Sequence, residues 1–453
     1  MKSGLADYSR VSGCIIFKPL SYNIWEKLKQ ECDKEFKKIR IRNCYFPLFI
    51  PEKLLSKEKE HVKGFSPEVA WVTHAGNSKL KERLAVRPTS ETIMYESFSK
   101  WIRSWRDLPL KLNQWNNVVR WEFKNPVPFF RTREFLWNEG HTAFATQKDA
   151  IEERDKIKKV YERICENFMA LPGIYGRKTE KEKFAGAIFS EKIHYALPNG
   201  RIIEGPCFHH DGQNFAKAYE IKFLDKNEKE EYVWQNTFAI STRMLGTMFA
   251  IHSDDKGLVI PPKLAENKIV IIPLLFKDKE EKVLKKAKEL EKQLNKFNPI
   301  LDNRKDYSPG RKFAEWELKG IPIRIEIGPK DIEKSSVTIK TRIGKEKKFL
   351  KIKEIKNEIP KILNEIQKEL YENAKKILES SMTKTENKKE LIKFIKEKKM
   401  VKVPLCNSIK IEEELKEKIK AKTLFIDTEK INKEKCIITG NKADYWVYVG
   451  KTY

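Results

Sequence analysis

The segment from Arg120 to Phe144, RWEFKNPVPFFRTREFLWNEGHTAF, carries side chains that bind phosphates and small polar ligands. Residues two apart in a strand lie on the same face, so Arg120 and Glu122 should point together on one arm of a hairpin. Arginine binds phosphate or carboxylate through two parallel hydrogen bonds, and a glutamate can accept one from the amino group of a purine. The pattern predicts a pocket wall that binds a triphosphate, although structural salt bridges would also explain it. The shared face of the second arm would hold Arg131, Arg133, Phe135, Trp137, Glu139 and His141.

A further arginine, Arg243, stands where the strand-like run NTFAIS gives way to the helical run RMLGTMFAIH. At such a junction a guanidinium can hold the terminal phosphates of a nucleotide. Transfer of a phosphoryl or adenylyl group depends on positioning and on neutralising charge, and it needs little covalent chemistry from the protein. Taken alone, however, an arginine at such a junction does not establish a nucleotide site.

Three groups of elements would position these side chains. Residues 1–262 are rich in aromatic residues, glycine and proline, and a helix is expected just after Thr89 or Ser90, either of which can cap it. Residues 266–350 alternate strand-like runs such as IVIIPL and IPIRIEIG with amphipathic helices, which is typical of a small α/β domain with a mostly parallel sheet. Residues 355–453 are rich in lysine and glutamate and are mostly helical in pattern.

The chain has 453 residues and a formal net charge of +27, carried mainly by lysine. Such a field favours a polyanion such as a nucleic acid, or an anionic membrane surface, although lysine-rich solvated helices would explain much of the charge. Seven cysteines without a CxxC pair indicate neither a disulfide framework nor a zinc ribbon. No apolar run approaches the length of a membrane span, and the amino-terminal residues contain no apolar signal segment. We expect a soluble intracellular protein of two or three domains.

Three of these pieces together resemble motifs 1, 2 and 3 of the class II aminoacyl-tRNA synthetases, in that order. Longer segments also resemble one particular family within this class. Segments such as LADYSRVSGCIIFKP, HVKGFSPEVAWVTHAG, HHDGQNFAKAYEIKF and GRKFAEWELKGIPIRIEIGPKD resemble prolyl-tRNA synthetases of the archaeal and eukaryotic type. The resemblance covers about residues 4 to 345, and its motifs are long and irregular, which makes a chance match very improbable.

The resemblance implies an α+β catalytic domain at 1–262 with a mixed, largely antiparallel sheet, an α/β anticodon-binding domain at 266–350 and a small α/β C-terminal domain at 355–453. It implies a proline–tRNA ligase, in which L-proline attacks the α-phosphate of ATP and the prolyl group then passes to the 3′ end of tRNA(Pro). Mg²⁺ is expected with the triphosphate, bound mainly through phosphates and water. A cytoplasmic homodimer is implied, because motif 1 builds the dimer interface in this class. The segment from about 145 to 235 is too short for the editing insertion of bacterial-type relatives.

The resemblance also assigns roles to individual residues. The TSE segment, Thr89, Ser90 and Glu91, would hold the secondary amine of proline. Arg120 would bridge the proline carboxylate and the α-phosphate, which makes it and Arg243 the implied catalytic residues. The amino-acid pocket would also include Arg120, Trp137, Glu139, His141 and His209, and the ATP site would combine Arg120, Glu122, Arg131, Thr132, Glu204, Cys207, Ser241 and Arg243.

Some positions depart from the family pattern. Glu204 stands where glutamine is often found, and Cys207 where threonine is usual. The negative charge of Glu204 close to phosphates is expected to affect nucleotide affinity but not the reaction. Of the four zinc-binding cysteines that relatives often carry in the C-terminal domain, only Cys406 and Cys436 are present. Two thiolates cannot complete a tetrahedral zinc site, so we expect no metal in this domain.

The domain at 266–350 would bind the anticodon loop, whose unpaired bases are read by edge hydrogen bonds and stacking. Its basic residues are candidates for contacts with the RNA backbone, although a solvated surface would explain each of them equally well. The candidates are Arg311, Lys312, Arg324, Lys330 and Lys340.

Other interpretations were weighed. A catalytically silent tRNA-binding paralogue would have no reason to keep all its nucleotide contacts, and the TSE loop and the run FLWNEGHTAF disfavour a synthetase for threonine or glycine. The pair His209–His210 could bind a metal, but adjacent residues of a strand point to opposite faces. The run HSDDKG, from His252, lacks the ligand spacing of a calcium loop, and a turn is expected there instead.

Overall fold

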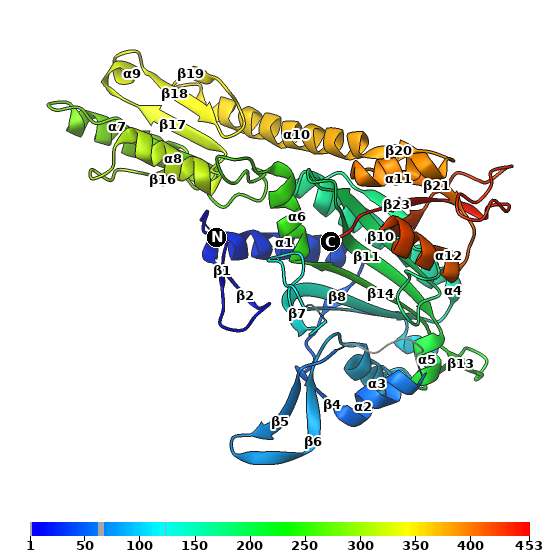
Figure 1. Cartoon of the computed structure of the whole chain (residues 1–453). Helices are drawn as coiled ribbons and strands as arrows, with labels where there is room; N and C mark the ends of the chain where they lie inside the picture. The colour runs from blue at the N-terminus through cyan, green and yellow to red at the C-terminus, as the bar shows by residue number, and fades with distance from the viewer. Residues whose placement is uncertain (1, 62–67, 123) are drawn as a thin grey trace.

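The structure is a computed structural model that describes residues 2–61, 68–122 and 124–453. The segment 62–67, which belongs to the run HVKGFSPEVAWVTHAG, lies outside the described residues. Among the described residues the largest sheet has eleven strands, in the order β20-β21-β23-β22-β9-β10-β11-β14-β8-β7-β3 (Figure 1). The strands that belong to the catalytic part are β3 (Arg42–Asn43), β7 (Leu110–Val119), β8 (Glu134–Phe144), β9 (Ile174–Arg177), β10 (Phe189–Ala196), β11 (Ile202–Gly212) and β14 (Trp234–Ser241).

From β9 to β7 all neighbouring strands of this sheet are antiparallel, and only β3 joins β7 in parallel. This confirms the mixed, largely antiparallel sheet expected for the catalytic domain. The other elements of this part are β1 (Ala6–Tyr8), β2 (Ile15–Phe17), β4 (Phe49–Pro51), β5 (Trp71–Ala75), β6 (Ser78–Val86), β12 (Lys222–Leu224), β13 (Glu230–Tyr232), α1 (Pro19–Lys38), α2 (Glu52–His61), α3 (Glu91–Trp101), α4 (Gln147–Arg163), α5 (Asn214–Ala218) and α6 (Arg243–His252).

Helices α1 and α4 cover one face of the sheet. Helix α1 starts at Pro19, which suits a first helical turn because that turn has no use for the missing N–H. Its buried residues Ile24, Leu28 and Phe36 recur at multiples of four and form an apolar stripe that packs on the sheet. Each fully buried side chain of this size contributes roughly 1.5–3 kcal/mol to stability. On this side Tyr161 of α4 donates a hydrogen bond to the Asn138 side chain, at 3.1 Å.

The hairpin β7–β8 carries the predicted pocket wall. The register sets Asn116 opposite Trp137, Gln114 opposite Glu139 and Leu112 opposite His141. The alternation therefore gives Trp137, Glu139 and His141 a common face, as predicted. The two arms are shorter than predicted, however. Arg120, Glu122, Arg131 and Arg133 lie in the connection, whose prolines Pro126 and Pro128 lack the N–H that continued pairing requires.

Between β8 and β14 the described residues form the helices α4 and α5, three strands of the same sheet and the small hairpin β12–β13. No separate domain is inserted there in the described part of the chain. The architecture therefore lacks an editing insertion, as the length of this segment predicted. None of the described helices is long and apolar enough to cross a membrane.

The anticodon-binding part contains a five-stranded sheet in the order β16-β15-β17-β18-β19. Strand β15 pairs in parallel with β16 and β17, but β17–β18 and β18–β19 are antiparallel. The expectation of a mostly parallel sheet is therefore wrong. A parallel connection needs a crossover of a dozen or more residues, and the segment 328–335 between β17 and β18 is too short for one. The elements are β15 (Ile269–Pro273), α7 (Glu280–Gln293), β16 (Ile300–Leu301), α8 (Pro309–Lys319), β17 (Ile323–Ile327), α9 (Pro329–Glu333), β18 (Ser336–Thr341) and β19 (Lys347–Lys351).

Helix α10 (Ile355–Ser381) leads from this part to the C-terminal strands, which extend the catalytic sheet through a bridge between Ile426 and Arg177 (Figure 1). Cys436 is buried in the apolar core of this region, and the Cys406 thiol donates a hydrogen bond to the Lys442 carbonyl oxygen at 3.3 Å. The elements here are β20 (Met382–Lys384), α11 (Lys388–Lys396), β21 (Met400–Leu405), α12 (Ile409–Glu414), β22 (Lys422–Ile426) and β23 (Tyr445–Gly450).

Arg342 ties the anticodon-binding part to the turn after α6. Its guanidinium is buried, donates to the carbonyl oxygens of Leu258, Gly257 and Glu317, and forms an ion pair with Asp254. We expect Arg342→Met to lower stability by about 2–3 kcal/mol, because several buried acceptors lose their donor. Thermal melting followed by differential scanning fluorimetry measures this loss.

The control for this substitution is Arg83→Met. Arg83 pairs with Glu52 at an exposed site, where an ion pair contributes less than about 1 kcal/mol. Equal shifts in melting temperature for the two variants would show that the Arg342 network does not hold the two parts together.

Candidate active site

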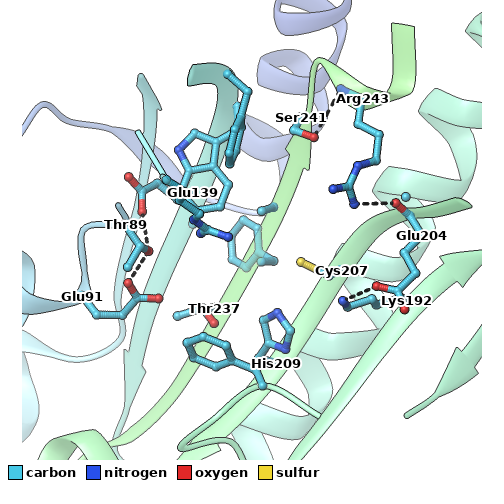
Figure 2. A pocket seen from close by; sticks show the side chains of 18 of the residues that line it. Thr89, Glu91, Glu139, Lys192, Glu204, Cys207, His209, Thr237, Ser241 and Arg243 are labelled. Carbon is cyan, nitrogen blue, oxygen red and sulfur yellow. Dashed lines mark hydrogen bonds and ion pairs between the residues drawn. The ribbon is translucent and has the colours of Figure 1, made fainter. Parts of the chain in front are cut away.

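A cavity of about 410 Å³ opens on the face of the sheet opposite α1 and α4. Strands β8, β11 and β14 form its floor, and the residues just before α3 and α6 form two of its sides (Figure 2). It brings together most of the side chains that the sequence predicted for the site. The predicted residues that line it are Thr89, Glu91, Arg120, Glu122, Thr132, Trp137, Glu139, His141, Glu204, Cys207, His209, Ser241 and Arg243.

One end of the cavity is acidic. Figure 2 shows Thr89, Glu91 and Glu139 together on that side, where the Thr89 hydroxyl donates a hydrogen bond to Glu91. The Glu139 carboxylate accepts hydrogen bonds from the Ser90 N–H at 2.9 Å and from the Asn116 side-chain amide at 2.6 Å. The buried carboxylate of Glu139 in β8 is therefore bonded to Ser90, just before α3, and to Asn116 of β7.

The two buried carboxyl groups differ in their pKa. Burial raises the pKa of Glu91, and the charge of Glu139 adds to this effect. Burial opposes ionisation of Glu139 as well, but hydrogen bonds from His141, Ser90 and Asn116 outweigh it and lower the pKa of Glu139 to about 2. Glu139 is therefore ionised at neutral pH, and this end of the cavity attracts a cation.

One donor atom from each of Glu91, Glu139 and His141 lies within 4.8 Å of the others. Among the described residues these three form a group that could hold a metal ion. The Glu139 oxygens, however, already accept hydrogen bonds from Ser90 and Asn116, which leaves few lone pairs for an ion. A secondary ammonium group needs only two acceptors for its two N–H groups, whereas a metal ion needs four or more ligands, so the ammonium group suits this arrangement better. The absence of a metal from the site stays a prediction.

Gly140 lies between Glu139 and His141 in β8 and allows the close approach of the next strand. A Cβ atom at this position would lie 2.0 Å from ring atoms of Phe238. A side chain here would push β14 away and change the spacing between Glu139 and the rest of the floor.

Arg120 also lines the cavity. Its Nε donates to the Pro88 carbonyl oxygen at 2.9 Å, and its guanidinium lies 5.3 Å from the ring centre of Trp137 and 5.5 Å from that of Phe135. Contacts with these two rings and the hydrogen bond to Pro88 restrict the orientation of the guanidinium. The remaining N–H groups can therefore meet a planar or tetrahedral anion in a defined direction.

Arg243 occupies the opposite end of the cavity, at the start of α6. Its Nε donates to the Phe130 carbonyl oxygen at 3.2 Å, and one terminal nitrogen donates to the Glu204 carbonyl oxygen at 3.3 Å. Its backbone N–H donates to the Ser241 hydroxyl oxygen at 3.4 Å. The cation is thus fixed to the connection of the β7–β8 hairpin and to β11.

Glu204 does not add unpaired negative charge to the cavity, which corrects the expectation from the sequence. Its carboxylate forms ion pairs of 2.7 Å with both Lys178 and Lys192 (Figure 2 shows Lys192). Although burial opposes ionisation, the two lysines hold the pKa of Glu204 well below its usual range. The group of three carries one net positive charge, and Lys192 lines the cavity beside Arg243.

Lys192 is a site residue that the sequence prediction missed. It lies in β10 directly opposite Cys207 of β11, so the register fixes its position on the cavity floor. The available signal was a pair of charged residues, Glu191 and Lys192, within the strand-like run FSEKIHYA. Charged residues inside a central strand need partners or a ligand, because burying an unpaired charge is unfavourable.

Two predicted site residues do not line the cavity. Ser90 is buried behind it, where its hydroxyl donates to Glu139 at 2.5 Å. Arg131 lines a neighbouring cavity of about 130 Å³ and donates to the Tyr453 carbonyl oxygen, while the adjacent Phe130 ring stacks on the Tyr453 ring. Neither side chain lines the cavity directly, and a contact of either one with a bound ligand stays a prediction.

The two adjacent histidines point in opposite directions, as strand geometry requires. His209 lines the cavity, and its Nδ1 lies 2.7 Å from the Ser190 hydroxyl. Burial lowers the pKa of His209 to about 3, so this ring is neutral at physiological pH. His210 lies on the other face, where its Nδ1 lies 2.8 Å from the Asn236 side-chain oxygen. The pair cannot share a metal. Burial also raises the pKa of the Cys207 thiol, which stays protonated.

The candidate anticodon residues have different environments. Lys312 is buried and donates to the Asp302 carbonyl oxygen at 3.1 Å, which contradicts the predicted contact with RNA. Arg324 pairs with Glu326, and Lys340 donates to the Gly344 carbonyl oxygen. Arg311 is exposed, and its guanidinium stacks on the Tyr307 ring at 4.0 Å.

The antiparallel sheet, the arginine in the β7–β8 connection and the arginine at the start of α6 define the amino-acid-activating core of a class II aminoacyl-tRNA synthetase. Family models agree with this class along the chain. Residues 71–252 match the tRNA synthetase class II core domain (G, H, P, S and T), 268–362 match the anticodon binding domain, and 388–453 match the C-terminal domain of prolyl-tRNA synthetase.

Relatives are similar over nearly the whole length. The chain is 45% identical over 445 residues to a proline–tRNA ligase of Natranaerobius thermophilus, which covers 98% of this chain and 92% of the relative. It is 44% identical over 467 residues to the cytoplasmic proline–tRNA ligase of Arabidopsis thaliana, covering 100% of this chain and 88% of the relative. A crystal structure of prolyl-tRNA synthetase from Cryptosporidium parvum, complexed with halofuginone and AMPPNP, superposes with a TM-score of 0.95 at 42% identity, covering 100% of this chain and 96% of that one. The chain belongs to the prolyl-tRNA synthetase family, of the archaeal and eukaryotic type, and its activity is that of a proline–tRNA ligase.

Proposed function

We propose that the acidic end of the cavity binds the secondary ammonium group of proline and the basic end binds the triphosphate of ATP. The observation that carries this proposal is the separation of charge within a single cavity. Thr89 and Glu91 lie at one end, and Arg243 and Lys192 lie at the other (Figure 2). Arg120 also lines the cavity and donates to the carbonyl oxygen of Pro88, next to Thr89. In this arrangement Arg120 contacts the proline carboxylate and the α-phosphate at the moment the two react.

The remaining lining residues receive narrower roles. Trp137, His141 and His209 enclose the proline ring, and a neutral His209 suits this role because it does not repel the ammonium group. Glu122 and Thr132 would contact the nucleotide near the connection of the hairpin. Ser90 acts indirectly, since it holds Glu139 in place.

A structure with proline and a non-hydrolysable ATP analogue tests this assignment. The expected pose has the proline nitrogen within hydrogen-bond distance of Glu91 and the β- and γ-phosphates beside Arg243. A pose with the phosphates against Glu91 and Glu139 would overturn the proposal.

Mg²⁺ would enter with the triphosphate. In the described lining, both Glu204 oxygens are paired with lysines, and Glu182 is paired with Lys422. Glu122 is the carboxylate that remains at this side of the cavity. The residues present therefore suit a hexahydrated or phosphate-bound ion better than a cage of protein carboxylates. When bound, the ion would neutralise part of the charge of the triphosphate.

Three further features belong to the same proposal. The partner is tRNA(Pro), held in part by the anticodon-binding region, where Arg311 is a candidate contact. The enzyme acts in the cytoplasm, like the cytoplasmic proline–tRNA ligase of Arabidopsis thaliana to which it is similar. It works as a homodimer, for which the exposed rings of Tyr45 and Phe49 beside β4 are candidate contacts. Sedimentation velocity tests the last point, because a monomer at micromolar concentration would contradict it.

Two explanations of the role of Glu204 predict opposite changes in the KM for ATP when this residue is replaced by glutamine. If Glu204 positions Lys192 for the phosphates, Glu204→Gln raises the KM for ATP by about tenfold, and Lys192→Met does the same. If Glu204 acted as an unpaired negative charge, Glu204→Gln would lower that KM. Steady-state pyrophosphate exchange with varied ATP distinguishes the two.

Lys222→Met is the control for this pair, because Lys222 forms ion pairs with Glu220 and Glu230 at the surface. Its KM for ATP should equal that of the unmodified enzyme. Lys178 loses its partner in Glu204→Gln, so thermal melting of that variant is needed to separate a loss of folded protein from a loss of affinity.

A further inference from the structure

A second, larger depression lies between the C-terminal strands and the catalytic sheet. This groove has a volume of about 740 Å³ and is lined by residues that follow α12, by the end of β23 and by the turn before β11. Two of its lining residues are acidic, Glu413 and Glu417. Its six cationic residues are Lys181, Arg201, Lys416, Lys420, Lys422 and Lys451.

Most of this positive charge is not neutralised by neighbours. Within the described residues, Lys416, Lys420 and Lys451 form no ion pair, whereas Lys181 lies 3.7 Å from Glu413 and Lys422 pairs with Glu182. Lys416 and Lys420 are exposed, and Lys451 is half-buried. A concave surface with an excess of cations concentrates the potential that attracts an anion.

The groove adjoins the active site through a smaller cavity. The cavity of about 130 Å³ beside Tyr453 shares Lys422 and Thr452 with the groove. The same cavity shares Glu204 and Arg243 with the active-site cavity. Three adjoining depressions therefore lie in a row from the surface to the basic end of the active site.

The position of the groove also suits a long ligand. Helix α10 separates the anticodon-binding region from the C-terminal strands (Figure 1). It has 27 residues and therefore spans about 40 Å. A tRNA whose anticodon loop lies at one end of this helix must still bring its 3′ end to the active-site cavity.

We propose that this groove binds the phosphate backbone of the acceptor arm of the tRNA and directs its 3′ end into the active site. Lysine side chains give sequence-independent contacts with phosphates, which suits a ligand that is held by its backbone. The inference rests on the ligase activity and adds a binding surface to it. The contacts would act in the transfer step alone, because proline activation requires no tRNA contact at this surface.

The test is the triple variant Lys416→Gln, Lys420→Gln, Lys451→Gln in the full-length enzyme. Its KM for tRNA(Pro) in aminoacylation should rise by about tenfold or more, and the dependence of log KM on log salt concentration should fall by roughly 2. Proline-dependent ATP–pyrophosphate exchange without tRNA should be unchanged, with an unchanged KM for pyrophosphate. Retained exchange shows that the variant is folded and that the proposed amino-acid and ATP sites are intact.

The matched control is Lys148→Gln, Lys156→Gln, Lys159→Gln. These exposed lysines lie on α4, which packs on the face of the sheet opposite the active-site cavity, and they remove the same charge. An unchanged KM for tRNA(Pro) in the groove variant would overturn the proposal, as would an equal rise in both variants, which would reflect overall charge. A rise in the KM for pyrophosphate alone would instead make the groove an exit path for that product.

Discussion

Arg120→Ala is expected to lower kcat/KM for proline-dependent ATP–pyrophosphate exchange by about 10³-fold or more. The guanidinium lines the cavity and is held by the Pro88 carbonyl oxygen and by cation–π contacts with Trp137 and Phe135. In the proposed arrangement it stabilises charge on both reacting groups as the carboxylate attacks the α-phosphate. Such stabilisation is greater in the transition state than in the ground state, so the loss should be mainly in kcat.

Two variants sharpen the Arg120 experiment. Arg120→Lys keeps the charge but loses the planar, stacked geometry, and its activity should lie between those of alanine and arginine. Arg106→Ala removes an exposed arginine that stacks on Trp105, and exchange should be unaffected. If Arg120→Ala lowers kcat/KM for exchange by less than tenfold, the proposed contact of Arg120 with both reacting groups is contradicted.

Glu91→Gln is expected to raise the KM for proline by about 100-fold while leaving the KM for ATP near its original value. Glu91 is buried at the acidic end, so it has few water molecules to compensate for a lost partner. A charge-assisted hydrogen bond to an ammonium group contributes roughly 1.5–3 kcal/mol, which corresponds to about 10- to 150-fold in affinity. Exchange assays with varied proline and varied ATP measure the two constants separately.

The pH dependence of the KM for proline follows from the same residue. Burial raises the pKa of Glu91, so this carboxyl group takes up a proton at a higher pH than an ordinary glutamate, whose pKa is about 4.3. Affinity for proline should therefore decline as the pH falls toward that raised pKa. In Glu91→Gln the decline should vanish, because no proton is taken up there.

Glu96→Gln is the control for Glu91. It lies on the same helix, α3, but forms a surface ion pair with Lys100. An equal rise in the KM for proline in both variants would point to a change in α3 as a whole. A pH profile that is the same with and without Glu91 would contradict the role of its carboxylate.

The strand face of β8 could be predicted because alternation depends only on the backbone. Trp137, Glu139 and His141 lie at spacings of two, and the antiparallel register of β7 and β8 turns them all into the cavity. The ends of the strands could not be predicted in the same way. Arg131 follows prolines and a Phe129 with a positive φ, and its direction depends on Tyr453, which is more than 300 residues away in the sequence.

Charges inside the site were the least predictable feature. From the sequence alone, the negative charge of Glu204 was expected to affect nucleotide affinity, because its neighbours in the fold were unknown. Its two partners come from separate strand-like runs, Lys178 at 26 residues and Lys192 at 12 residues before it. Only the pairing of β9, β10 and β11 brings them together. Lys312, counted as an RNA contact from its charge alone, is likewise buried by the tertiary packing around Asp302.

The order of the motifs predicted the fold class, but it did not predict which distant regions would share a sheet. Among the described residues, the C-terminal segment joins the catalytic sheet through a bridge between Ile426 and Arg177 and a second bridge between Thr452 and Ile202. No local pattern in either segment indicates this partner. The groove between these regions was hidden for the same reason, since its lysines are scattered over about 270 residues of sequence.

The most direct test of the account is ATP–pyrophosphate exchange measured with each of the twenty amino acids in turn. The charge-separated cavity predicts exchange with proline that exceeds exchange with the others, and its loss in Arg120→Ala. Exchange driven best by another amino acid, such as threonine or glycine, would contradict the assignment of the acidic end to proline. If exchange with proline is undiminished in Arg120→Ala, the proposed role of Arg120 in the reaction is contradicted.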